Sequence, residues 1–421
     1  MPLPAHHPLH PLNYFATFGN ALPEAVSFTY FNLEGTNGTT SNFRRMGSRR
    51  HQMPGAVVVQ RGFALMRSVK ARDLVLVTTG PSGSVEEQIR RILGVCGTDT
   101  RLCTLRVFHT DRDCDEASLT RRIASALPRN AAVVLTFVPV PSYGLSEGGF
   151  GIEAMGVTGA EMGKVHVARG LSAFDPFVAG LRCGRYFFIG AQRASRSSSL
   201  IAETKEVMEA LSQTLSELGV HFSDIVRMNR WYHADGTKAA WAPPAQLVAG
   251  FYQEPGPVAT AISLAVPFQA GLSLQIELLG MVATDGTPFP KSHSWPDDHW
   301  DWPIHLPYKH GLLCEGLIFV GGQVSLDARA EVIDPERLDL QIARSLKNID
   351  RVLEGFSGRS KRMLHLDAYY QVLTSVDADL NSGSLALKQL AAGVSPVTLV
   401  GLRNLSYPQM RVEIEAIAEI T

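Results

Sequence analysis

The sequence lacks several features that mark common classes of protein. Its 421 residues include five cysteines with no CxxC pairing, which argues against a disulfide framework. No stretch reaches the ~18 consecutive apolar residues typical of a membrane-spanning helix. The N-terminus, rich in Pro and His, has neither the basic nor the apolar region of a signal peptide. We therefore expect a soluble, cytoplasmic protein without membrane association.

Charge excess and cofactor-binding motifs are also missing. The formal net charge is −1, so the chain has no basic excess that would attract nucleic acid. It has no Gly-rich phosphate loop, no Gly-x-Ser-x-Gly elbow and no dinucleotide fingerprint. We expect no organic cofactor, no resident metal and no nucleic-acid partner.

What the sequence does contain is a strand pattern that occurs three times. Residues 411–418 alternate charged and apolar side chains, which places Glu413 and Glu415 on one face of a strand. Weaker versions occur at residues 151–154 and 275–278, each after a series of strands and helices. These units are too long for a solenoid repeat, so the sequence predicts three similar α+β domains.

The pattern divides the chain into five segments. Residues 1–50 form an N-terminal extension with strands, and residues 51–162 form the first and most diverged domain. The second domain spans 163–282, a linker spans 283–304, and the third domain spans 305–421. Apolar residues at helical spacing predict helices over 85–93, 116–127, 201–218, 341–353 and 385–390.

The linker is dense in Trp, His and Asp. Its candidate metal ligands do not follow a standard zinc spacing, so we expect no metal there: His293, Asp297, His299 and His305. The tryptophans and prolines indicate a strap packed over an interdomain cleft, with some character of a lid.

Four segments of the third domain form a recognisable set. They are Pro-Tyr-Lys-His at 307–310, Phe-Val-Gly-Gly-Gln at 319–323, the helix at 341–353 and the strand at 412–418. Together they resemble the Rid (YjgF-type, reactive intermediate deaminase) superfamily. The resemblance implies three Rid-like, chorismate-mutase-like domains, each a mixed sheet backed by two helices. Because family members are usually homotrimers with clefts between subunits, it implies a single-chain pseudo-trimer, either monomeric or dimeric.

The resemblance also implies roles for individual residues. In Rid deaminases the first glutamate of the strand pattern handles a water, which implies a catalytic role for Glu413, with Glu415 beside it. Tyr308 falls where the family has a cleft tyrosine. The first glutamate is replaced by Gly151 and Gln275 in the other two domains.

The second glutamate of the pattern recurs as Glu153 and Glu277. Because it is kept where the first glutamate is lost, we expect it to belong to the framework of the domains.

The family's second working residue is an arginine that binds a substrate carboxylate, and here the sequence departs from the family. Val397 stands at that position in the third domain, and no domain has the complete pair. Other anion receptors are then needed, and the candidate substrate-binding residues are Arg193, Arg230, Lys309 and the backbone N–H groups of Gly321 and Gly322.

These observations favour a cofactor-free enzyme with Glu413 as general acid/base. Its substrate would be a small reactive imine, enamine or related biosynthetic intermediate that carries a carboxylate. The reaction would be hydrolysis, deamination, or a proton-transfer or cyclisation step. One alternative is a chorismatase-like hydrolase of an enol ether, and another is a non-catalytic small-molecule binding or scaffold protein.

Overall fold

The computed structural model describes residues 66–421 apart from short gaps. The gaps are residue 82, 111–114, 145, 148–149, 160–161, 163–164, 170–175, 235–236, 357–359, 373–385 and 391–395. The strands predicted in the N-terminal extension lie outside the described residues.

Sheet 1 is built from the first part of the chain and has six strands. Their order is β1 (Arg67–Ala71), β2 (Leu74–Thr78), β7 (Phe150–Thr158), β3 (Thr100–His109), β4 (Val133–Pro139) and β9 (Phe177–Val178). Helices α1 (Val85–Cys96) and α2 (Glu116–Ala126) cover one face, where Ile89 and Ile123 pack against strand residues such as Leu105. Helix α1 begins with a capping box between Ser84 and Glu87, which satisfies two backbone N–H groups.

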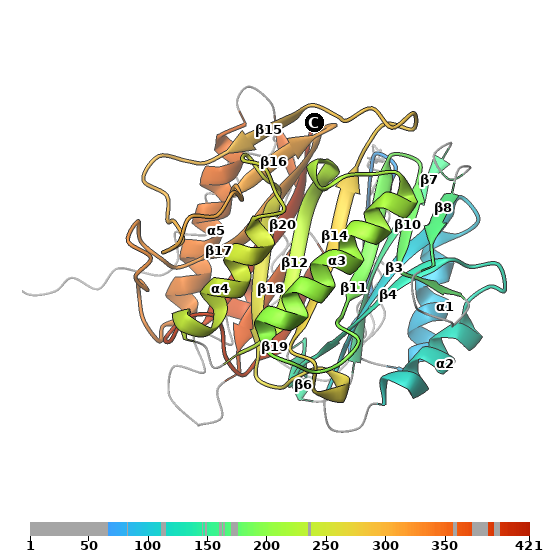
Figure 1. Cartoon of the computed structure of the whole chain (residues 1–421), viewed down its shortest axis with the longest axis horizontal. Helices are drawn as coiled ribbons and strands as arrows, with labels where there is room; N and C mark the ends of the chain where they lie inside the picture. The colour runs from blue at the N-terminus through green and yellow to red at the C-terminus, as the bar shows by residue number, and fades with distance from the viewer. Residues whose placement is uncertain are drawn as a thin grey trace, which may run out of the picture. The chain divides into compact units, whose positions relative to one another are not determined.

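Sheet 2 also has six strands. Their order is β13 (Val258–Leu264), β12 (Ile225–His233), β14 (Leu274–Met281), β11 (Tyr186–Gln192), β10 (Gly180–Cys183) and β8 (Val165–Ala168). Helices α3 (Leu200–Leu218) and α4 (Lys238–Ala249) lie across its strands (Figure 1). As predicted, α3 ends at Gly219, which adopts the left-handed conformation with φ of 64°. Two 3-10 turns, Phe222–Asp224 and Gln269–Gly271, connect the elements.

Sheet 3 has eight strands. Their order is β15 (Lys291–Ser294), β16 (Gly311–Cys314), β17 (Leu317–Val324), β20 (Val412–Ile420), β18 (Lys361–Gln371), β19 (Val397–Leu402), β5 (Ser142–Tyr143) and β6 (Ser146–Glu147). Helix α5 (Leu338–Glu354) packs on β17 and β20, and residues 386–390 are also helical. The hairpin β5–β6 comes from the first part of the chain, so sheet 3 is completed by a distant segment.

The predicted helices α1, α2, α3 and α5 are confirmed, whereas α4 was not predicted. Pro243 and Pro244 lie inside α4, and proline normally ends a helix because it lacks an N–H donor. The predicted linker also contains an unpredicted strand, since β15 pairs with β16 in sheet 3. The three sheets confirm an α+β chain built of mixed sheets with few helices.

The faces of the sheets that the helices do not cover pack against one another. One apolar cluster joins Leu76, Phe188 and Phe319, one from each sheet. A second joins Phe108, Trp231 and Tyr369 in the same way. These inner clusters are therefore shared among the three sheets. The helix-side clusters of sheets 1 and 3 belong to one sheet each, whereas that of sheet 2 also takes in Leu306 and Tyr308.

Two glycines allow neighbouring sheets to approach closely. An added Cβ at Gly321 of β17 would lie 2.8 Å from the backbone oxygen of Ala259 in β13. At Gly190 of β11, a Cβ would lie 2.9 Å from a side-chain carbon of Val134 in β4. Because both clashes involve a neighbouring sheet, the glycines serve the packing between sheets.

Replacing Gly321 with alanine is expected to lower the free energy of unfolding by about 1–3 kcal/mol, since a backbone atom must move. Gly94 of α1 is the matched control, because nothing lies within 4 Å of its added Cβ. Gly94→Ala is expected to be neutral or to stabilise by up to about 1 kcal/mol. Urea unfolding monitored by circular dichroism measures both, and equal effects would contradict the close packing.

Candidate functional site

The strand registers make the three glutamate-bearing strands equivalent. In the strand registers, Glu153 of β7 lies opposite Arg106, Glu277 of β14 lies opposite Asn229, and Glu415 of β20 lies opposite Asp367. Two residues earlier, the positions are Gly151, Gln275 and Glu413, opposite Phe108, Trp231 and Tyr369 respectively. The residues that are equivalent in the three sequence patterns therefore also occupy equivalent positions in their strands.

Glu415 lies at the centre of a buried hydrogen-bond network. It accepts hydrogen bonds from Asn229 at 2.8 and 3.0 Å, from the Tyr369 hydroxyl at 2.6 Å and from the Thr260 hydroxyl at 2.5 Å, and it pairs with Arg227. A carboxylate with this many donors is held in a fixed position. Glu415 therefore links sheets 2 and 3, in agreement with a framework role.

Arg106 extends this network to sheet 1. Its guanidinium lies 2.6 Å from Glu153 and 3.8 Å from Asp367, and it also pairs with Glu277. Burial opposes the charged form of the Glu153 carboxyl, but Arg106, Asp367 and His365 together outweigh that effect and lower its pKa. The second glutamates of the three domains thus meet in one network with two arginines.

Glu413 has a different environment although it shares a face of β20 with Glu415. Its side chain lies over Gly322, where an added Cβ would come within 1.9 Å of its carboxyl oxygen. Burial and, after it, repulsion from Glu415 raise the pKa of Glu413 to about 8, partly offset by the backbone of Ala261 and by Arg230. Glu413 is therefore largely a neutral acid near pH 7.

Three polar groups around Glu413 have buried atoms without partners. The Tyr308 hydroxyl, the Arg230 Nε and the Tyr407 hydroxyl make no hydrogen bond within the described part of the chain. The Arg230 guanidinium lies over the ring of Tyr232, 5.1 Å from its centroid. Arg230 also influences the pKa of both Tyr308 and Glu413, and Glu413 influences that of Tyr407. Unpaired buried polar groups are costly, so their concentration here indicates a site where a ligand supplies the partners.

Arg230, from β12 of sheet 2, is thus the predicted anion receptor whose charge acts on both Glu413 and Tyr308. The sequence predicted it as one of several receptors, and the structure places it with Glu413 and Tyr308. Tyr232 and Tyr407 were not predicted. No local motif marks them, because they join the site only through the packing of sheets 2 and 3.

The equivalent position in sheet 2 is closed by protein side chains. Gln275 accepts a hydrogen bond from Arg193 at 2.8 Å and donates one to the backbone oxygen of Phe137 at 2.8 Å. Arg193 also makes a bidentate pair with Glu116, at 2.7 and 3.1 Å. Because these donors are engaged, Arg193 links sheets 1 and 2.

The equivalent position in sheet 1 is filled by an aromatic ring. An added Cβ at Gly151 would come within 1.7 Å of the Tyr143 ring, whose hydroxyl donates to the backbone oxygen of Thr79 at 2.9 Å. Tyr370 of sheet 3 donates to the backbone oxygen of Gly144 at 2.7 Å. Of the three equivalent positions, only that of Glu413 combines a carboxyl group with unpaired buried polar atoms.

The remaining predicted substrate-binding residues lie in other surroundings. The N–H of Gly322 donates to the Thr260 hydroxyl at 3.0 Å, and the N–H of Gly321 donates to the His310 backbone oxygen at 3.0 Å, so neither presents an unused donor. Lys309 pairs with Glu254 at 2.6 Å near the surface. Val397 is the first residue of β19, with a partly buried side chain.

The Trp- and His-rich segment packs as a strap with one strand in it. Trp302 stacks on His310 at 5.1 Å and meets Tyr308 edge-on at 6.4 Å. His299 approaches the Gln323 amide oxygen at 2.8 Å. Burial lowers the pKa of His299 to about 4, so this imidazole is neutral near pH 7. The segment thus covers Tyr308 with aromatic rings.

Comparisons with known proteins bear on the family of the C-terminal part and on the fold. A family model described as Endoribonuclease L-PSP matches residues 303–420. A crystal structure of a chorismatase superposes with a TM-score of 0.52 at 14% identity, covering 82% of this chain and 98% of that chain. No match was found among curated proteins. The Rid-type resemblance of the third domain is therefore confirmed, and the fold resembles a chorismatase over most of the chain.

Two single-domain structures resemble smaller parts of the chain. Rv2704 from Mycobacterium tuberculosis, of the YjgF/YER057c/UK114 family, has 17% identity and covers 28% of this chain and 100% of its own, with a TM-score of 0.26. The Rid-family protein YyfA from Yersinia pestis has 20% identity and covers 31% and 99%, with a TM-score of 0.25.

Glu413→Gln is expected to stabilise the protein at high pH. A carboxyl whose folded pKa is raised above its unfolded value contributes stability below the unfolded pKa and loses it as pH rises through the folded pKa. With a folded pKa of about 8, the gain from the amide grows between pH 5 and pH 9 and reaches on the order of 2–4 kcal/mol.

Thermal unfolding of wild type and variant at pH 5, 7 and 9 measures this effect. Glu209→Gln, on the exposed face of α3, is the control and is expected to change little at any pH. A Glu413→Gln effect that does not vary with pH would show that the Glu413 carboxyl is ionised in the folded protein.

Proposed function

We propose that this chain, whose residues 303–420 form a Rid-superfamily domain, is a cofactor-free hydrolase that protonates an electron-rich double bond in a small carboxylate substrate. Glu413 is the proton donor, and Arg230 binds the substrate carboxylate. The observation that carries the proposal is the buried, largely neutral Glu413 beside the unpaired polar atoms of Arg230 and Tyr308.

The chemistry follows from the protonation state of Glu413. An acid with a pKa near the working pH is mostly protonated and still transfers its proton readily. Protonation of the terminal carbon of an enol ether or enamine gives an oxocarbenium or iminium ion, and water adds to that cation. The adduct collapses with loss of the alcohol or amine, and the proton from water returns to Glu413.

The other groups position the substrate. Arg230 offers a charged, planar donor suited to a carboxylate. The Tyr308 hydroxyl supplies a neutral donor whose pKa burial keeps above its usual range, so it remains protonated. The aromatic rings of Trp302 and Tyr252 pack against Tyr308 and limit access of bulk water.

We propose an enol ether as the first substrate class and an enamine or imine as the second. The enol ether is supported by the chorismatase-like fold over 82% of the chain, and the enamine by the Rid-type domain. In either case one chain supplies both sides of the cleft, as a single-chain pseudo-trimer that is monomeric or dimeric. We also propose that the protein is cytoplasmic and has no nucleic-acid partner. No helix among the described residues is both long and apolar enough to cross a membrane.

Glu413→Gln is expected to lower kcat by about 10²–10⁴-fold, because the proton donor is lost. Substrates are chorismate, assayed by pyruvate release, and an enamine or imine of a 2-amino acid generated in situ, assayed by ammonia release. Wild-type activity should fall above pH 8, as Glu413 ionises. Glu209→Gln should retain full activity.

Arg230→Gln and Tyr308→Phe separate binding from chemistry. Arg230→Gln is expected to raise KM by about 10–100-fold, since a charge-assisted pair with the carboxylate is lost. Tyr308→Phe removes only the hydroxyl and should have a smaller effect. Tight binding of both substrates without turnover would instead support a non-catalytic binding protein.

A further inference from the structure

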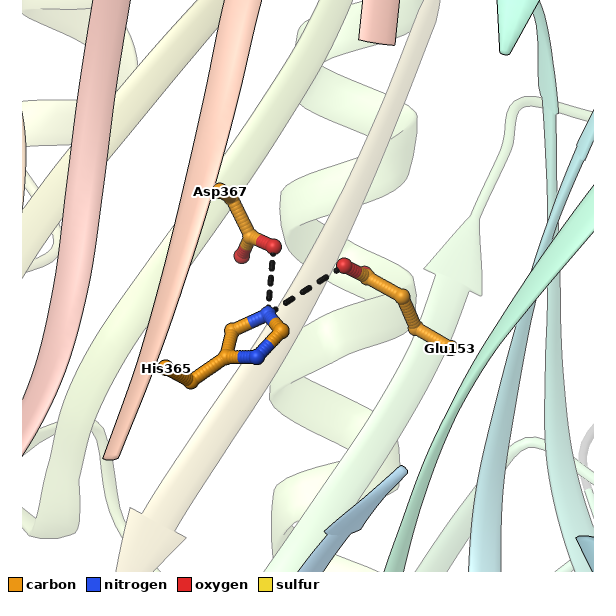
Figure 2. Close-up of side chains that lie close together, drawn as sticks. All are labelled: Glu153, His365 and Asp367. Atoms are coloured by element: carbon orange, nitrogen blue, oxygen red, sulfur yellow. Dashed lines mark hydrogen bonds and ion pairs between the residues drawn. The ribbon is translucent and has the colours of Figure 1, made fainter. Parts of the chain in front are cut away.

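Glu153, His365 and Asp367 form a second cluster of polar groups, in the network between the sheets (Figure 2). His365 Nε2 lies 2.6 Å from one oxygen of Asp367 and 3.4 Å from one oxygen of Glu153. Each of the three side chains offers one possible metal-ligand atom. In the part of the chain that the structure describes, these three atoms lie within 4.8 Å of one another. We propose that these three residues bind one divalent transition-metal ion.

The two carboxylates are prepared for this role by their other oxygens. The second oxygen of Glu153 is bound by Arg106 at 2.6 Å, and the second oxygen of Asp367 is bound by Arg227 at 2.9 Å. Each carboxylate is therefore oriented by an arginine and presents its remaining oxygen to His365. Ligands fixed in this way lose little freedom when an ion binds.

His365 is less constrained than its partners. It is 4% exposed, and its Nδ1 is buried without a hydrogen-bond partner. The ring is thus anchored only through Nε2, the atom that faces the two carboxylates. One imidazole with two carboxylates is a ligand set that suits Zn²⁺, Mn²⁺ and Fe²⁺ better than Mg²⁺ or Ca²⁺, which prefer oxygen ligands alone.

The charges of the network also favour a divalent cation. Arg106 and Arg227 face four carboxylates, namely Glu153, Glu277, Asp367 and Glu415. Two guanidinium charges against four carboxylates leave an excess of negative charge away from water, which a bound cation offsets.

There is also space for an ion. Glu153, His365 and Asp367 line the same cavity of about 50 Å³, and a single water needs about 15 Å³ on this measure. Metal–ligand distances of about 2 Å require Nε2 and the Asp367 oxygen to move from 2.6 Å to about 3 Å apart. The ion displaces the Nε2 proton of His365 to solvent, which leaves a neutral imidazole protonated on Nδ1. Water completes its coordination.

Metal content of purified wild-type protein tests the proposal directly. After unfolding in chelator and refolding with equimolar Zn²⁺, Mn²⁺ or Mg²⁺, followed by gel filtration, we expect about one Zn²⁺ or Mn²⁺ per chain and no retained Mg²⁺. His365→Gln and Asp367→Asn should reduce retention at least tenfold. His299→Gln, a buried histidine outside the cluster, should retain the ion fully.

Cobalt spectroscopy needs only the wild-type protein, so its result does not depend on whether the variants fold. Wild-type protein refolded with Co²⁺ should show visible d–d bands, and paramagnetically shifted imidazole proton signals should report a bound histidine. No retained metal in the wild type, or retention equal in wild type and a folded His365→Gln variant, would overturn the proposal. Hydrolysis by the Glu413 site is a separate readout, so either proposal can fail without the other.

Discussion

The pairing of Arg106 and Arg227 with four buried carboxylates is the constraint on which the arrangement of the three sheets depends. These residues are each 12% exposed or less at the side chain, and their contacts cross from sheet to sheet. Removing one partner of a buried ion pair strands the other charge and typically costs about 3–5 kcal/mol. The glutamate that recurs in all three domains is therefore kept because each copy completes a common network.

The chain uses its three equivalent strand positions differently. Gln275 with Arg193 and Gly151 with Tyr143 fill two of them with satisfied side chains. At the third, Glu413 is buried with the surrounding polar groups left incomplete. Because the three strands differ in sequence, each position can serve a different purpose, either packing or binding.

Much of the fold was predictable from the sequence because its periodic signals are strong. The strands of the three glutamate patterns and helices α1, α2, α3 and α5 follow alternation or helical spacing. Helix α4 was missed since Pro243 and Pro244 contradict local propensity, and the burial of Trp241 and Val248 stabilises it instead. Strand β15 was missed because its pattern is polar.

The candidate site was predictable only in part. Glu413, Tyr308 and Arg230 were named from residue type and resemblance, but nothing in the sequence joined Arg230 to the other two. Tyr407 reaches the Glu413 site from a distant segment, and Glu153 and His365 form their own cluster from distant strands. Residue spacing in the sequence gives no signal for contacts between such distant segments. The proposed metal ligands have no shared sequence signal because Glu153 lies far along the chain from His365 and Asp367.

The hairpin β5–β6 also bears on how the chain folds during synthesis. Its partner β19 leaves the ribosome only after sheets 1 and 2 have been synthesised. The hairpin therefore waits without its partner, and β19 meets a preformed edge as soon as it emerges, which shortens the time that this strand is open to wrong pairing. It follows that removing the hairpin β5–β6 would leave β19 as an unprotected strand edge.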